Sequence, residues 1–111
     1  MNVWDLFVPG RTARLQARLA NEIAQRCRVD AWRRIERRAT GMRLSEARGY
    51  MRARATEVIH REVDHALACQ AGAERLDRGQ LVNQAGNLVV ALLFRDLLHV
   101  PVRYRPLRRA A

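Results

Sequence analysis

The sequence contains no lysine, and all 21 of its basic residues are arginine. Chains that bind phosphate commonly use both cations, because lysine serves well as a point charge. The complete absence of lysine therefore indicates a coding bias toward arginine as one source of the arginine count. The net charge of +10 at pH 7 is present either way, and it favours an anionic partner, either nucleic acid or an acidic protein surface.

Proline and cysteine are also scarce. The three prolines stand at positions 9, 101 and 106, so the long stretch between the first two lacks the residue that most strongly breaks a helix. The two cysteines, Cys27 and Cys69, fall within helical patterns and provide no disulfide framework. We interpret both as buried thiols that pack as small hydrophobic side chains, with a single disulfide between them as the alternative.

Several functional signals are missing. The sequence has no glycine-rich phosphate loop, no metal-ligand spacing of cysteine and histidine, and no nucleophile motif, so we expect no enzyme, no cofactor and no small-molecule substrate. The longest apolar run, LVVALLF at 88–94, is far shorter than a membrane span. The segment MNVWDLFVPG has no basic region and predicts no signal peptide. We therefore expect a cytoplasmic protein without a membrane partner.

Helical patterns occupy most of the chain. Its 111 residues predict a single domain, which we place at 1–100, followed by a basic and flexible tail at 101–111. The expected fold is all-α, a bundle of three main helices at about 11–39, 45–70 and 78–99.

The ends of these helices carry recognisable signals. Gly41 is expected to end the first helix, Ser45 to cap the start of the second, and Gly72 to end the second. Asp77 is followed three residues later by Gln80, which is similar to a capping box with aspartate in place of serine or threonine. These signals predict short connections between long helices.

The first helix has an apolar ladder with a step of four residues. Because an α-helix has 3.6 residues per turn, such a stripe drifts around the helix by about 40° per step. The helix can wrap around its neighbours, or it can break near Asp30, and we favour one long, bent helix because no strong breaker is present. The ladder consists of Leu15, Leu19, Ile23, Cys27, Ala31, Ile35 and Ala39.

The third helix is apolar on more than one side. Its main face is predicted to hold Leu81, Val82, Ala85, Leu88, Val89, Leu92 and Leu93. A second set covers much of the other side and is the candidate self-association surface: Val90, Phe94, Leu97 and Leu98. Either the N-terminal segment with Trp4, Leu6 and Phe7 or another subunit should cover this second set, since a helix that is apolar all round is normally buried all round. We expect a homo-oligomer, with a dimer as the usual form.

The positive charge is concentrated in the first half of the chain. Residues 1–56 hold 13 arginines against five acids, residues 57–98 hold four against six, and the remainder adds four arginines. Like charges four residues apart in the first helix repel each other by about 0.2–0.5 kcal/mol per pair, which argues for an anionic partner. The candidate anion or nucleic-acid surface comprises Arg33, Arg34, Arg37, Arg38, Arg43, Arg48, Arg52, Arg54, Arg108 and Arg109.

Two acids, Glu62 and Asp96, fall within the apolar faces of their helices. Each precedes a histidine by three residues, a spacing that also occurs in helical metal sites. The two acids should however lie about ten residues apart along the bundle, roughly 15 Å, so we expect no metal. A buried carboxylate needs a cationic partner, and we predict that each acid contacts an arginine from another helix. The proposed partners are Arg18, Arg48 and Arg52.

Two functions are compatible with this pattern. The first is a protein-interaction or assembly module that self-associates through its third helix. The second is a nucleic-acid-associated protein that contacts phosphates through its arginines without reading sequence. Only Tyr50 and Tyr104 could stack on bases, which disfavours recognition of single strands by stacking. The interaction module is marginally favoured by the sequence.

Overall fold

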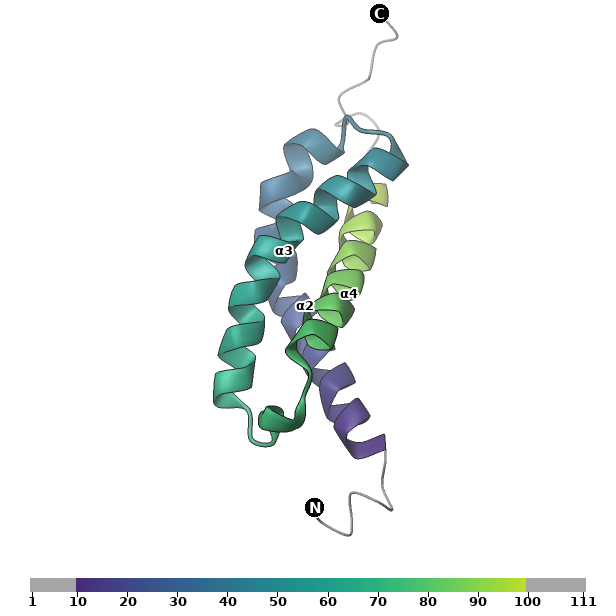
Figure 1. Cartoon of the computed structure of the whole chain (residues 1–111). Helices are drawn as coiled ribbons and strands as arrows, with labels where there is room; N and C mark the ends of the chain where they lie inside the picture. The colour runs from purple at the N-terminus through teal and green to yellow at the C-terminus, as the bar shows by residue number, and fades with distance from the viewer. Residues whose placement is uncertain (1–9, 100–111) are drawn as a thin grey trace, which may run out of the picture.

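The computed structural model of the chain describes residues 10–99. It contains three long helices, α2 (Gly10–Ala39), α3 (Leu44–Cys69) and α4 (Arg78–Leu98), and a short 3₁₀ helix, η1 (Ala73–Arg75), before α4. The helices run up, down and up (Figure 1). The prediction of an all-α bundle of three main helices is confirmed, and every predicted helix end lies within one residue of the observed one.

Helix α2 is continuous through Asp30. The predicted ladder is buried along nearly its whole length, from Leu19 to Ala39, while Leu15 at its start is half-buried. The stripe faces different neighbours as it drifts around the helix, so one unbroken helix can contact both α3 and α4. The long first helix is therefore confirmed without the break near Asp30.

The same step of four residues recurs in the other two helices. In α3 the buried ladder includes Ala47, Met51, Ala55, Ile59 and Val63, and in α4 it comprises Leu81, Ala85, Val89, Leu93 and Leu97. Rows of side chains at this spacing are inclined to the helix axis, and helices that pack such rows together cross obliquely. Figure 1 shows this arrangement, with α2 running obliquely behind α3 and α4.

The drift of the α4 ladder changes the interpretation of its second apolar set. Val90 and Leu97 are each 4% exposed and belong to the core of the chain itself. Phe94 is half-buried against that core, and only Leu98 is strongly exposed, at 62%. The expectation that this set needs an external cover is therefore wrong for Val90 and Leu97. The helical wheel used for the prediction assumed that the buried face does not rotate along the helix. It therefore assigned one continuous, rotating stripe of apolar residues to two separate faces.

The first connection differs from the prediction at its cap. The N-cap position of α3 is Arg43, whose side chain makes no capping hydrogen bond, and Ser45 already lies inside the helix. The cap assigned to Ser45 is therefore wrong. On the other side of the turn, the Thr40 hydroxyl donates to the Glu36 carbonyl oxygen at 2.9 Å and ties the end of α2 to its last turn.

The second connection contains the predicted cap of α4. Asp77 Oδ1 accepts a hydrogen bond from the Gln80 backbone N–H at 3.0 Å, as predicted. The Gln80 side chain instead accepts from Gln16 of α2 at 3.3 Å. Gly72 has a φ of 83° in the turn after α3, a conformation that side chains with a Cβ rarely adopt.

Helix α4 is the only helix within residues 10–99 that is long and apolar enough to cross a membrane, judged by length and composition alone. Its side chains Leu81, Val89 and Leu93 are fully enclosed by the bundle. The core helix of a three-helix bundle meets the same criterion, so one such helix is weak support for a membrane span.

Candidate anion-binding site

A cleft of about 330 Å³ lies between α2 and α3, close to the turn that joins them. It is lined by Arg33, Arg34, Arg37, Arg38, Tyr50 and Arg54, and these six residues are called the upper cleft below. Among residues 10–99, no carboxylate lines it. Five of the ten arginines in the sequence-predicted anion surface are therefore brought together in one place.

The position of these arginines follows from the burial of their neighbours. Ala31, Ile35 and Ala39 are held in the core at 0%, 0% and 1% exposure, so the arginines between them along α2 lie toward its outer side. Helix α3 returns antiparallel after a short turn, and its buried Met51 and Ala55 place Tyr50 and Arg54 beside α2. Two rows of side chains thus meet along the outer groove of the helix pair.

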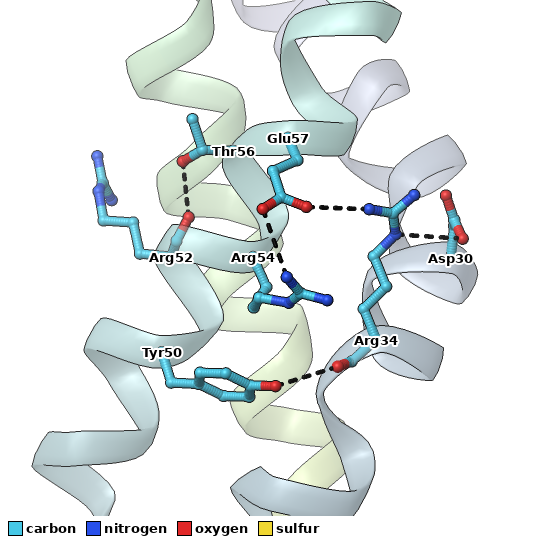
Figure 2. A network of polar contacts seen from close by, with 7 residues as sticks. All are labelled: Asp30, Arg34, Tyr50, Arg52, Arg54, Thr56 and Glu57. Atoms are coloured by element: carbon cyan, nitrogen blue, oxygen red, sulfur yellow. Dashed lines mark hydrogen bonds and ion pairs between the residues drawn. The ribbon is translucent and has the colours of Figure 1, made fainter.

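A polar network fixes part of the upper cleft (Figure 2). The Arg34 guanidinium lies 3.1 Å from Glu57 and 3.7 Å from Asp30. Arg54 lies 3.4 Å from the other oxygen of Glu57. The Tyr50 hydroxyl donates to the Arg34 carbonyl oxygen at 3.3 Å. This hydrogen bond ties the Tyr50 side chain of α3 to the backbone of α2.

The network compensates only part of the charge. Five arginines face two acids, Asp30 and Glu57, which leaves a local balance of +3. The exposed side chains Arg33, Arg37 and Arg38 form no ion pair within the described part of the chain. Their guanidinium groups are free to donate to an oxyanion, for which the planar fork of arginine is well suited.

The other arginines of the predicted surface have different roles. Arg43 is exposed and lies 4.0 Å from Glu46, and Arg48 is exposed and does not line the upper cleft. Arg52 points away from the upper cleft (Figure 2) and donates to Asn83 and Asn87 of α4 at 2.7 and 2.5 Å. Arg108 and Arg109, with the rest of the 101–111 tail, lie outside the described residues, as does the N-terminal segment with Trp4, Leu6 and Phe7.

The two apolar-face acids have different surroundings. Asp96 forms a bidentate pair with Arg28 of α2, in which Arg28 Nε donates at 2.9 Å and Arg28 Nη2 contacts the other oxygen. The pair raises the pKa of Arg28, chiefly through the hydrogen bond. The partner comes from another helix but is none of the three arginines proposed from the sequence.

Glu62 departs from the prediction more strongly. Its side chain is half-buried and forms no ion pair with an arginine within residues 10–99, so the expected pair with Arg18, Arg48 or Arg52 is wrong. The negative charge of Glu62 instead acts on a neighbouring thiol. The pKa of the buried Cys27 is raised to about 11 by burial first, and then by the negative charges of Glu62 and Asp30.

The thiols and histidines form no larger cluster. Both cysteines are free, but Cys69 is exposed, so its assignment as a buried thiol is wrong. The sulfur of Cys69 lies 3.8 Å from Nε2 of His65, one turn earlier in α3. Across residues 10–99, no three histidine, cysteine or acidic side chains converge as metal ligands would.

The sequence analysis missed a second basic cleft at the opposite end of the bundle. This lower cleft has a volume of about 600 Å³ and lies where the start of α2 meets the connection after α3. Its arginines are Arg11, Arg14, Arg18 and Arg75, and one acid, Glu74, also lines it. The i, i+3, i+7 spacing of the first three was visible in the sequence, but the position of Arg75 depends on the fold.

The chain matches no protein-family model, no curated protein sequence and no solved structure. The fold and the site together define a small, all-α, arginine-rich three-helix bundle with a basic cleft near each end.

Proposed function

We propose that this protein binds the phosphate backbone of nucleic acids without reading their sequence. The observation that supports the proposal is the upper cleft, where five arginines and no acid line one groove. Arginine donates to phosphate oxygens in a bidentate fashion, and backbone phosphates supply such oxygens at regular intervals. Arg34 and Arg54 are fixed by Glu57, while the outer arginines remain available for the ligand.

The arrangement favours backbone contact over base recognition. Tyr50 is the only aromatic side chain in the cleft, and its hydroxyl is bonded to α2. Stacking on bases needs a freely presented aromatic face, so the affinity should be electrostatic. Electrostatic binding to a nucleic acid releases counterions and weakens steeply as salt increases.

The test compares two variants that lose the same charge. Arg33→Gln with Arg37→Gln removes two exposed arginines from the upper cleft, whereas Arg61→Gln with Arg95→Gln removes two exposed arginines that line neither the upper nor the lower cleft. Fluorescence anisotropy with a generic duplex should show wild-type affinity falling as salt rises from about 50 to 200 mM. The cleft variant should bind more weakly, and its slope of log affinity against log salt should decrease by about 2.

The control variant should keep most of the wild-type affinity, and circular dichroism should show equal helicity for all three proteins. Equal losses in the two variants would mean that total charge, not the cleft, determines binding. Absence of binding by the wild type at low salt would contradict the proposed function.

We also propose, as a second function, self-association through the end of α4. The supporting observation is Leu98, which is 62% exposed beside the half-buried Phe94. Sedimentation equilibrium at micromolar concentration should then give a dimer mass, and Leu98→Ser should shift the equilibrium toward monomer while the melting temperature stays nearly constant. A monomer across this concentration range would contradict this second function.

A further inference from the structure

We infer that the lower cleft is a binding site for an oligophosphate, the chain of linked phosphate groups found in inorganic polyphosphate and in nucleoside triphosphates. The lower cleft takes no part in the proposed contact between the upper cleft and nucleic acid, so the two sites can be tested independently. Three features carry the inference: arginines from two segments that line one space, the fold that holds these segments together, and the short extent of the positive surface.

Arginines from two separate segments line the lower cleft. Arg11, Arg14 and Arg18 are exposed along α2, and Arg75 is exposed on η1. Because residues three or four apart are neighbours on the surface of a helix, the first three form one row. Among the described residues, Glu74 is the only acid that lines the cleft, so four arginines and one acid leave a balance of +3. An anion that carries several negative charges in a short length would offset this balance.

The turn after α3 holds the two segments together. Gly72 adopts a φ of 83°, and the position of its missing Cβ lies 3.7 Å from Leu15 Cδ2 of α2. Ala73 of η1 is 2% exposed and anchors the turn. The backbone that carries Arg75 is therefore fixed beside the row on α2 before any ligand binds. A site that is already formed loses less conformational entropy on binding than one that must be ordered.

The first turn of α2 adds to the attraction for anions. It contains no acidic residue, and the positive end of the helix macrodipole lies there. Arg14 Nε lies 3.8 Å from the position that a Cβ on Gly10 would occupy, so the Arg14 side chain folds back over this turn. Cations are unfavourable at this end of a helix, and a bound anion would offset both the dipole and the arginines.

The positive surface is short. The row from Arg11 to Arg18 covers about 10 Å along the helix axis. Toward the middle of the bundle, the lower cleft adjoins a smaller one of about 150 Å³, with which it shares Gln70. One arginine, Arg26, and one acid, Glu22, line this middle cleft, so their charges cancel. A compact chain of phosphates fits such a surface better than an extended polymer does.

The lower cleft offers little for the recognition of a base. No aromatic side chain within residues 10–99 lines it, and base recognition by stacking needs such a side chain. The phosphate chain itself should therefore determine the affinity. Inorganic tripolyphosphate and ATP share this chain, whereas adenosine lacks it.

Isothermal titration calorimetry at about 50 mM salt, without divalent cations, compares these three compounds. Tripolyphosphate and ATP should bind the wild-type protein with similar affinity, and adenosine should not bind. Binding of adenosine, or ATP binding far more tightly than tripolyphosphate, would contradict the assignment to the phosphate chain. Absence of tripolyphosphate binding would overturn the inference.

Two double variants with the same loss of charge locate the site. Arg11→Gln with Arg14→Gln should weaken tripolyphosphate binding by at least about tenfold, because two charge-assisted donors are lost. Arg61→Gln with Arg95→Gln removes two exposed arginines that do not line the lower cleft and should weaken it much less. Glu74→Gln removes the acid from the cleft and should strengthen binding by about twofold or more, a gain that unfolding cannot produce.

The upper-cleft variant, Arg33→Gln with Arg37→Gln, separates this site from the proposed function. It should keep most of its affinity for tripolyphosphate while losing affinity for the duplex, and the lower-cleft variant should behave in the opposite way. Equal losses of tripolyphosphate affinity in all three double variants would mean that net charge alone attracts the anion, and the inference would be overturned. Neither result changes the outcome of the duplex test.

Circular dichroism excludes unfolding as the cause of a loss. The lower-cleft variant should melt no lower than the wild type, because removing positive charge from the start of a helix is favourable. Tripolyphosphate should raise the melting temperature of the wild type, since a ligand that binds the folded state stabilises it. The same addition should raise that of the lower-cleft variant less, and an equal rise in both would place the anion elsewhere.

Discussion

Arg52 donates to the side-chain oxygens of Asn83 and Asn87, which are four residues apart on α4. Both partners are neutral amides. The guanidinium therefore connects α3 to α4 while no carboxylate among the described residues offsets its positive charge. Arg34, by contrast, is held by two carboxylates. The same residue type thus serves as a connector between helices and as part of a cleft, and its partners determine which.

The two thiols are predicted to differ in reactivity. Cys27 is fully buried with a pKa of about 11, so only about one molecule in a thousand carries its thiolate at pH 8. Cys69 is exposed. A thiol reagent such as DTNB should modify one cysteine per native chain at pH 8 and the second only after denaturation.

The matched control is Cys69→Ser, which should show no fast reaction in the native state. Raising the pH toward 11 should increase the slow reaction of Cys27, because its thiolate fraction rises with pH. Two fast thiols in the native wild type would contradict the buried position of Cys27.

The pair between Asp64 and Arg78 predicts a pH dependence of stability. Arg78 donates to both oxygens of Asp64, at 2.8 and 3.2 Å, and this hydrogen bonding lowers the pKa of Asp64. A carboxyl with a lowered pKa in the folded state stabilises the fold above its ordinary pKa, and that contribution is lost as the pH falls through the lowered value.

Asp64→Asn should therefore lower the melting temperature slightly above about pH 4. The difference from the wild type should disappear as the pH is lowered further. Thermal melts monitored by circular dichroism across this range measure it. A difference that stays constant down to strong acid would exclude the ion pair as its cause.

For single residues, the sequence predicted which face of a helix a side chain occupies better than it predicted which residue that side chain pairs with. Asp96 was expected to pair with an arginine of another helix, but Arg28, its observed partner, lies 68 residues away. A helical wheel ranks exposure within one helix and carries no information on the register between helices. Glu62 shows the same limit, since no arginine of a neighbouring helix reaches it within the described residues.

At the scale of elements, the start of α4 depends on its cap. Asp77 Oδ1 accepts the Gln80 backbone N–H, and loss of such a cap typically costs about 1 kcal/mol. Asp77→Ala should lower the melting temperature by about 4–8 °C for a domain of this size.

Ser45→Ala is the matched control, because Ser45 lies within α3 and does not cap it. It should change stability by less than about 0.5 kcal/mol. Denaturant unfolding of both variants measures the difference, and equal losses would contradict the assignment of the two positions.

Two glycines should respond to alanine in opposite directions. Gly86 is buried in α4, and a Cβ there would meet Arg52 Nη2 and Ile59 Cδ1 at 3.8 Å, an ordinary contact distance. Because glycine costs about 0.8–1.0 kcal/mol relative to alanine inside a helix, Gly86→Ala should stabilise the protein by up to that amount.

Gly72→Ala should destabilise by about 1–2 kcal/mol, because alanine resists its positive φ. Differential scanning calorimetry of the two variants gives both signs. A destabilised Gly86→Ala protein would show that the bundle cannot accept the extra methyl group between α3 and α4.

The helices themselves were predictable because no proline lies between Gly10 and Leu98 to interrupt them. Long apolar periodicity and glycines or an aspartate at the connections located every end to within one residue. The buried face of α4 was not predictable with a fixed wheel. Its ladder rotates from Leu81 to Leu97, and only the oblique packing against two neighbours determines where the stripe lies at each turn. The upper cleft likewise depends on the antiparallel return of α3.

At the scale of the whole molecule, the net charge of +10 should make stability depend on salt. At about 10 mM salt, charges interact over about 30 Å, and at about 150 mM over about 8 Å. Repulsion among the arginines then weakens, while the exposed ion pairs lose little because each contributes little. The melting temperature should rise between these two concentrations.

The rise should be smaller when Arg33 and Arg37 are both replaced by Gln, since their charges lie in the upper cleft among three further arginines. Thermal melts in sodium chloride measure both effects. A melting temperature that falls with salt would mean that the ion pairs outweigh the repulsion.

The odd number of long helices has a consequence for the use of the chain as a building unit. The first residue of α2 and the last residue of α4 lie at opposite ends of the bundle (Figure 1). A bundle of two or four antiparallel helices would bring these two points together. Here the 30 residues of α2 act as a strut of about 45 Å, so groups attached at the two ends would be held apart by a fixed length.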